Sequence, residues 1–149
     1  MKNVIRLFLC TMMLLFATTA CTFAYSNPYP KYLGGDTNFI LVDGHMGTAW
    51  YVDKSSLNVQ MYEPPQYIIA INVCTVNNAD RGNTEISNVQ TMRFLYNYDL
   101  RRMYIDRHTG SDDWRYLNPR GSWAETGVSM PAGEKAFELA YGIEFYHLR

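Results

Sequence analysis

The sequence between residues 66 and 76 decides the fold class, because it reads Gln66-Tyr-Ile-Ile-Ala-Ile-Asn-Val-Cys-Thr-Val76. A nearly continuous run of Ile and Val is typical of a strand that is buried on both faces. We therefore predict a central strand here, in which the amide of Asn72 needs a hydrogen-bonding partner. The preceding Glu63-Pro64-Pro65 predicts a firm break, because consecutive prolines suit neither a helix nor a central strand.

Shorter apolar segments on both sides of this strand predict further strands, separated by turn-like or polar sequence. The expected strands are residues 38–43, 48–53, 89–98, 102–108 and 114–117, with residues 54–57 leaving the sheet and residues 77–88 and 118–128 as loops. Side chains alternate between the faces of a strand. Phe94, Tyr96 and Tyr98 should therefore share one face of their strand.

The C-terminal segment has helical periodicity instead. Ser129 is a candidate cap, Pro131 suits a first turn, Glu134 places negative charge near the positive end of the helix dipole, and Gly142 is a candidate stop. Ile143–Leu148 is compatible with a last strand or with a continued helix. The chain is thus predicted to be α+β, with an antiparallel sheet of five to six strands and one C-terminal amphipathic helix packed on one face.

The first 24 residues predict a secretory signal peptide. Basic residues lie in Met1–Arg6, an apolar run follows in Leu7–Phe16, and small residues close the segment. The run is about half as long as a bilayer-spanning helix requires. Two processing sites remain open, namely cleavage before Tyr25 and lipidation of Cys21. We expect residues 1–24 to be the signal peptide, 25–37 a flexible lead and 38–149 a single domain, secreted or held in the cell envelope.

Charge and cysteine content narrow the possible partners of the mature chain. The full sequence has 13 Lys and Arg against 14 Asp and Glu, and loss of Lys2 and Arg6 leaves a net charge of −3. No basic stripe is present, so nucleic acid is not an expected partner. Membrane contact is expected only through the signal peptide or a lipid anchor. Cys74 alone remains within the domain, where we expect a buried and inert thiol rather than a disulfide.

Residues of catalytic or metal-ligating type meet at one weak constellation. Asp106 and His108 should share a strand face, with Asp112 across a turn. These residues suggest a metal or acid–base site, and hence a small extracytoplasmic hydrolase or metal-dependent enzyme as an alternative function. A solvated hairpin end with ion pairs to Arg107 and Arg115 is the favoured interpretation. We therefore predict no catalytic residue, no metal site and no cofactor, and expect the protein not to be an enzyme.

Several segments resemble the surface-adhesin E-like domains of exported bacterial proteins. The similar segments, which span residues 38–146, are Trp50-Tyr-Val-Asp-Lys-Ser-Ser-Leu57, Phe94-Leu-Tyr96, Met103-Tyr104, Trp114-Arg115 and Pro131-Ala-Gly-Glu134 to Tyr141. The resemblance implies a surface-associated domain with a sheet and a helix. In the family's namesake this fold binds host matrix and serum proteins. No binding residue of that family is matched by a motif in this chain.

The leading expectation is a non-enzymatic, adhesin-like binding module at the cell surface or in the envelope, with a protein or another surface ligand as its partner. Tyr96, Tyr98 and Tyr104 are the candidate contact residues, provided that their sheet face is the one that the helix leaves open. Packing in the core beneath the helix is the favoured interpretation of these three side chains. A further alternative is a structural or inhibitory envelope protein that pairs with its partner through a sheet edge.

Overall fold

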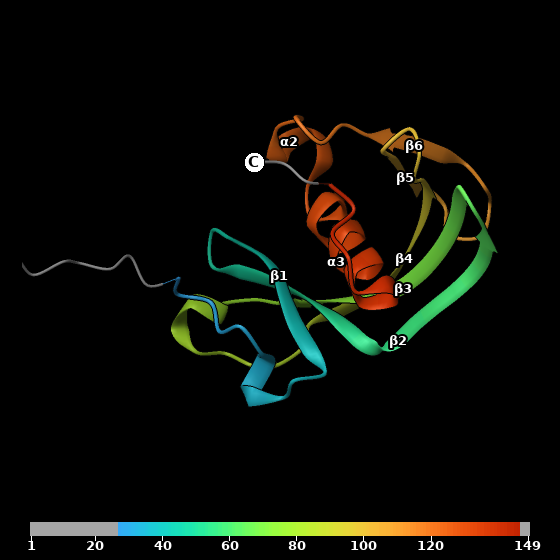
Figure 1. The fold of residues 1–149 in the computed structure, drawn as a ribbon. Coiled ribbons are helices and arrows are strands. Elements are labelled where there is room, and N and C mark those ends of the chain that lie inside the picture. The colour runs from blue at the N-terminus through green and yellow to red at the C-terminus, as the bar shows by residue number, and fades with distance from the viewer. Residues whose placement is uncertain (1–26, 147–149) are drawn as a thin grey trace, which may run out of the picture.

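Six antiparallel strands lie in the sheet in the order in which they occur in the chain. They are β1 (Phe39–His45), β2 (Thr48–Glu63), β3 (Gln66–Val76), β4 (Asn88–Asn97), β5 (Arg102–Asp106) and β6 (Trp114–Leu117). The computed structural model describes residues 27–146, so the predicted signal peptide, Cys21 and Tyr25 lie outside the described residues. The sheet curls around the C-terminal helix α3 (Ser129–Tyr141), as Figure 1 shows. The predicted α+β class is confirmed.

The central position of β3 is also confirmed. It is hydrogen-bonded to β2 on one side and to β4 on the other. Its Ile69 and Ile71 belong to the main core under α3, whereas Val76 belongs to a second apolar cluster. Asn72 has the partner that its position requires, because the Thr91 hydroxyl donates a hydrogen bond of 2.7 Å to its side-chain oxygen.

Strand β2 is much longer than predicted. Residues 54–57 do not leave the sheet, and the strand continues to Glu63. Its register against β3 shifts between Asp53 and Asn58, which is a bulge that bends the strand and helps the sheet to curl. The hydroxyl of Ser56 donates to the backbone oxygen of Asp53 (2.7 Å) and accepts from the backbone N–H of Asn72 (2.8 Å). The prediction failed because the polar residues of this bulge have the composition that is typical of the end of a strand.

The predicted break at Glu63-Pro64-Pro65 is confirmed as the connection between β2 and β3, and its Pro64–Pro65 peptide bond is cis. The segment predicted as a loop after β6 instead contains a short helix, α2 (Trp123–Thr126). Short 3₁₀ turns also occur at η1 (Leu33–Gly35) and η2 (Ala79–Arg81).

Helix α3 lies within the curve of the sheet, where it buries Ala132, Ala136 and Phe137. Ser129 is its first residue rather than its cap, because Val128 occupies the N-cap position and no side chain caps the helix there. Gly142 ends the helix as predicted, with a φ of 72° that suits glycine.

The described residues after Gly142 form neither a strand nor a helix, which answers the question left open for residues 143–146. Phe145 is nevertheless fully buried, whereas Ile143 is 44% exposed. Residues 147–149 lie outside the described part. The buried Phe145 closes the far side of the core rather than extending the sheet.

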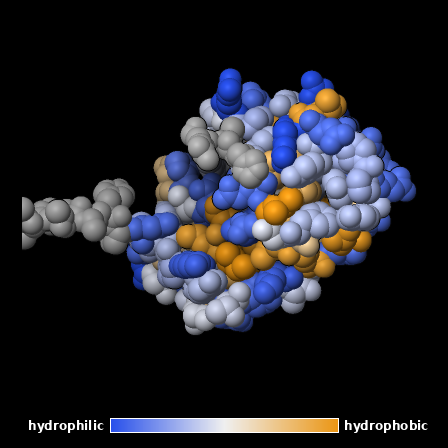
Figure 2. All heavy atoms as spheres, in the orientation of Figure 1, coloured by the Kyte–Doolittle hydropathy of each residue, from blue (hydrophilic) through white to orange (hydrophobic). Residues whose placement is uncertain are grey.

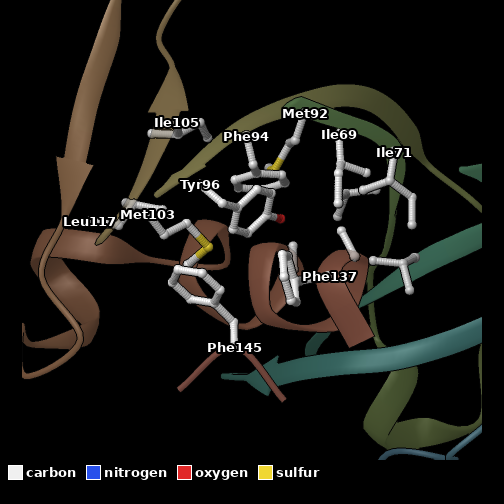
Figure 3. Packing of buried hydrophobic residues seen from close by; sticks show 14 of the residues in the cluster. Ile69, Ile71, Met92, Phe94, Tyr96, Met103, Ile105, Leu117, Phe137 and Phe145 are labelled. Atoms are coloured by element: carbon white, nitrogen blue, oxygen red, sulfur yellow. The ribbon is translucent and has the colours of Figure 1, made fainter. Parts of the chain in front are cut away.

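Aromatic rings form the centre of the main core. The ring of Phe137 lies 5.0 Å from that of Tyr96 and 5.0 Å from that of Phe145, measured between centroids. Figure 3 shows these rings meeting between the helix and the strands, with Phe94 and Met103 beside them. Such contacts between apolar side chains, which are removed from water, hold the helix against the sheet.

The segment expected to be a flexible lead is packed against β1 in its described part. Leu33 is buried, Tyr32 forms a β-bridge with Ile40, and the Tyr29 hydroxyl accepts a hydrogen bond of 2.9 Å from the backbone N–H of Gly47. The ring of Tyr29 lies so close to Gly44 that a side chain there would collide with it. From Tyr29 onward, this segment therefore belongs to the packed domain and covers an edge of β1.

Candidate functional site

The three tyrosines predicted as contact residues do not form one surface. Tyr96 is completely buried, and its hydroxyl donates a hydrogen bond of 2.7 Å to the backbone oxygen of Gly133 in α3. Tyr98 lies on the same face, where its ring stacks on Phe137 at 5.9 Å. The proviso that the helix leaves this face open is therefore wrong for both residues.

Tyr104 lies on the opposite face of the sheet. The register pairs it with Leu95 and pairs Tyr96 with Met103, so alternation separates Tyr104 from Tyr96. Its ring lies 5.5 Å from that of Tyr116, and these two residues and Arg102 line a hollow of about 340 Å³. Of the three candidates, Tyr104 alone borders a hollow on the face away from α3.

Asp106, the last residue of β5, holds together the loop between β5 and β6. Its side chain is fully buried and accepts hydrogen bonds from Gly110 N–H (2.8 Å), Ser111 Oγ (2.9 Å) and Arg93 (3.1 Å). Burial alone would raise the pKa of this carboxyl group, but the hydrogen bonds outweigh it and the pKa is lowered well below its usual range. The carboxylate therefore holds the loop and the guanidinium together.

The other two members of that constellation, Asp112 and His108, also have partners, and Asp112 shares Arg93 with Asp106. Asp112 forms an ion pair with Arg93, and His108 lies with its Nδ1 3.4 Å from Asp113. Asp113 also pairs with Arg107 at 2.6 Å. Among residues 27–146, no group of three or more His, Cys, Asp or Glu side chains is placed to hold a metal ion. The geometry thus offers no observation in favour of a site at Asp106, His108 and Asp112.

The thiol of Cys74 is buried, as predicted. Burial, and secondly the charge of Asp53, raises its pKa, so the reactive thiolate is disfavoured. The thiol is therefore a packing group on the face of β3 opposite to Ile69 and Ile71.

A groove lies between β1 and α3, on the face shown in Figure 2, where hydrophobic residues gather over these two elements. Its volume is about 400 Å³, which is within the range of small-molecule sites. Apolar and charged side chains share its lining, which consists of Leu41, Val42, Pro131, Glu134, Lys135, Glu138, Glu144, Phe145 and Tyr146. The groove thus combines apolar walls with carboxylates, a combination that suits an amphiphilic ligand.

Glu134 is the carboxylate of the groove with a perturbed protonation equilibrium. Burial raises its pKa, and the negative charge of Glu144 raises it further. Lys135 is engaged in an ion pair with Glu138 on the same helix. The helical pattern of this segment indicates only a role for Glu134 at the helix dipole. No sequence signal indicated the groove, because β1 and α3 are far apart in the sequence. They come together only when the chain folds.

The β1–β2 hairpin is tied to α2 close to this groove. The indole N–H of Trp123 donates a hydrogen bond of 2.6 Å to Asp43, which follows the lining residue Val42 in β1. The imidazole of His45 stacks on Trp123 with ring centroids 4.5 Å apart. This contact fixes the position of the hairpin relative to the helical part of the domain.

The two edges of the sheet are relevant to the alternative function, in which the protein pairs with a strand of its partner through a sheet edge. The edge of β1 is covered in part by Tyr29 and Tyr32. The other edge is β6, which has four residues, and its Arg115 side chain reaches the backbone oxygen of Glu125 at 3.0 Å. A partly covered edge and a short edge are features that disfavour pairing with another chain.

Comparisons with known proteins add nothing to this geometry. No protein-family model, no curated protein and no solved structure matches the chain. The resemblance to surface-adhesin E-like domains therefore stays a prediction. Within residues 27–146, no helix is long and apolar enough to cross a membrane.

Proposed function

We propose that the chain is an exported, non-enzymatic binding module of the cell surface or envelope, and that it binds a small amphiphilic ligand in the groove between β1 and α3. The observation that carries this proposal is the groove itself, in which the apolar Leu41, Val42 and Phe145 share a space of about 400 Å³ with carboxylates. Pockets of this size with apolar walls and a few polar groups are the usual form of a ligand site.

The location in the cell is supported by the sequence. A basic start, an apolar run of about ten residues and a small-residue end are the features that export machinery reads. The assignment as a binding module rather than an enzyme is supported by the engagement of Asp106 with Arg93 and with its own loop. An adhesin-like role at the surface, as the family resemblance implies, is compatible with such a site.

Mass spectrometry of the protein recovered from the producing cell tests export. We expect the chain to begin at Tyr25, or at a lipidated Cys21. A protein that retains Met1–Ala24 in the cytoplasm would contradict the proposal.

Binding is tested by an NMR titration of the exported protein with n-octanol, an uncharged amphiphile. We expect shifts of the backbone signals of Leu41, Val42 and Phe145. Leu41→Gln should weaken this binding, since it replaces part of an apolar wall by an amide of similar size. Tyr116→Ser, on the opposite face, is the matched control and should leave the binding unchanged. Octanol that shifts no signal of the groove would contradict a ligand site there.

A further inference from the structure

Side chains of β5 and β6 line the hollow on the face of the sheet away from α3. Tyr104 of β5 pairs with Tyr116 of β6 in the antiparallel register, so their side chains are neighbours on one face. Arg102 precedes Tyr104 by two residues and therefore projects from the same face of β5. These residues surround a space of about 340 Å³, which shares no lining residue with the groove between β1 and α3.

The guanidinium group of Arg102 has no counter-ion in the part of the chain that the structure describes. The residue is exposed, and its side chain forms neither an ion pair nor a hydrogen bond with any residue of 27–146. Four other arginines of this region do have such a partner, namely Arg93, Arg101, Arg107 and Arg115. The planar fork of N–H donors on Arg102 is thus available at the hollow, and its geometry matches that of a carboxylate.

The two tyrosines add aromatic faces and two available hydroxyl groups. Their rings are inclined at 60° with centroids 5.5 Å apart, and Tyr116 is 44% exposed. Within residues 27–146, neither the Tyr104 nor the Tyr116 hydroxyl has a hydrogen-bonding partner. The face of an aromatic ring is the negative end of its quadrupole, so it attracts the C–H bonds of a ring that lies on it.

These features together restrict the chemistry of a matching ligand. A purely apolar ligand would leave the guanidinium group and both hydroxyls without partners while it displaced their water. A ring that is apolar on its face, bears hydroxyl groups at its rim and carries a carboxylate satisfies all three side chains. Sugars that contain a carboxylate have this combination.

We propose that the hollow is a second binding site and that its ligand is an acidic sugar, a pyranose ring that carries a carboxylate. The carboxylate pairs with Arg102, the C–H face of the ring lies on Tyr116, and the ring hydroxyls bond with the tyrosine hydroxyls. This site goes beyond the proposed function, because it assigns another ligand class to another face of the sheet.

The test compares three probes by NMR titration of the exported protein at pH 7, namely methyl β-D-glucuronide, methyl β-D-glucoside and benzoate. The two sugars differ only in a carboxylate against a hydroxymethyl group, and benzoate has a carboxylate on a flat ring without hydroxyls. We expect shifts at Arg102, Tyr104 and Tyr116. The glucuronide should bind about fivefold more tightly than the glucoside, which corresponds to about 1 kcal/mol for one exposed ion pair.

Substitutions assign this preference to individual side chains. Arg102→Gln should remove it and leave the affinity for the glucoside unchanged, whereas Arg102→Lys should retain part of it, because an ammonium group lacks the planar fork. Tyr116→Ala should weaken the binding of both sugars. Arg81→Gln, at an exposed arginine of η2 outside the hollow, is the matched control and should keep the preference.

The outcomes separate this inference from the proposed function, since Leu41→Gln in the groove should leave the binding of the glucuronide unchanged. Equal affinity for the two sugars overturns the inference, as does a preference that survives Arg102→Gln. Benzoate that binds at least as tightly as the glucuronide overturns the assignment to a sugar and favours aromatic carboxylates. Absence of shifts around the hollow with all three probes contradicts a site there.

Discussion

The hydroxyl of Tyr96 in β4 donates a hydrogen bond of 2.7 Å to the backbone oxygen of Gly133 in α3. This bond joins the sheet to the helix that covers it, at a position where the helix has no side chain. A Cβ atom on Gly133 would lie 2.4 Å from the sulfur of Met103 and 3.0 Å from the ring of Phe94. The helix thus approaches the sheet through a glycine, and the tyrosine anchors it there.

Removal of the Tyr96 hydroxyl should weaken the domain without changing its shape. We expect Tyr96→Phe to lower the free energy of unfolding by about 1 kcal/mol, the usual net value of one buried hydrogen bond. Urea unfolding measures this change. Tyr98→Phe is the matched control, since the ring of Tyr98 packs on Phe137 of the same helix, and it should change the stability by less than about 0.5 kcal/mol. Equal effects of the two substitutions would contradict the role of the Tyr96–Gly133 bond.

Gly133→Ala should destabilise the domain, although alanine is the better helix former. The gain in helix propensity is about 1 kcal/mol, whereas forcing a methyl group into a filled core costs about 1–3 kcal/mol. Met103 is fully buried and has little room to yield. We expect a net loss of about 1 kcal/mol by urea unfolding. In a Met103→Ala background the collision with Met103 is absent and the 3.0 Å contact with Phe94 remains, so the same substitution should there cost much less.

Asp106→Asn should destabilise the domain by about 2 kcal/mol at pH 7, because it leaves the half-buried Arg93 without one of its two carboxylate partners. The folded-state pKa of Asp106 lies below its unfolded value of about 3.9. Its stabilising effect is therefore complete above that value and is lost as the pH falls below it. The difference between wild type and variant should shrink between pH 5 and about pH 2. Asp113→Asn, at an exposed pair, is the control and should have a much smaller effect.

Glu134→Gln should make the unliganded protein slightly more stable at pH 7. Because the folded-state pKa of Glu134 is raised, its ionised form weakens the fold at neutral pH, and this penalty is relieved as the pH falls through that pKa. We expect a gain of about 0.5 kcal/mol at pH 7 that diminishes toward pH 4. Thermal or urea unfolding across this range measures it. A variant that is less stable than wild type at pH 7 would show that Glu134 is a structural carboxylate.

Trp123→Ala should loosen the contact between the β1–β2 hairpin and α2. The substitution removes the stack on His45 and the hydrogen bond to Asp43, and we expect a loss of about 1–2 kcal/mol. Hydrogen exchange should become faster at the hairpin tip and in residues 123–126 together. Trp123→Phe retains a ring for the stack but lacks the indole N–H, so its effect should be intermediate. Faster exchange in only one of the two segments would contradict the coupling.

The sequence was most informative where local pattern and tertiary environment agree. The Ile and Val of residues 66–76 specify a strand buried on both faces, and the consecutive prolines before it specify where the chain reverses. It was misleading at residues 54–57, because a bulge keeps polar residues such as Ser56 within a strand. A single polar segment gives no local signal that distinguishes a bulge from a strand end.

The candidate site could be predicted only in part. Tyr98, the residue after β4, shares the face of Tyr96 because alternation along the chain is a local rule. The position of Tyr104 depends instead on the register between β4 and β5. The expectation of a solvated hairpin end at Asp106 is wrong, because its side chain is buried. Its partners Arg93 and Ser111 follow from how the loop folds back on the sheet. The pairing between two strands cannot be predicted from the sequence of either strand alone.

The fold class, the central strand, the terminal helix and the buried thiol of Cys74 can each be predicted without the structure, since each follows from the periodicity or composition of one continuous segment. Which tyrosines are buried, and where the groove lies, depend on how segments that are distant in the sequence pack together. The groove exists because β1 and α3, which are far apart in the sequence, pack against each other. Their contact brings Leu41, Val42 and Glu134 around one space. A cavity is a property of the distance between segments, and that distance is fixed only when the whole core is assembled.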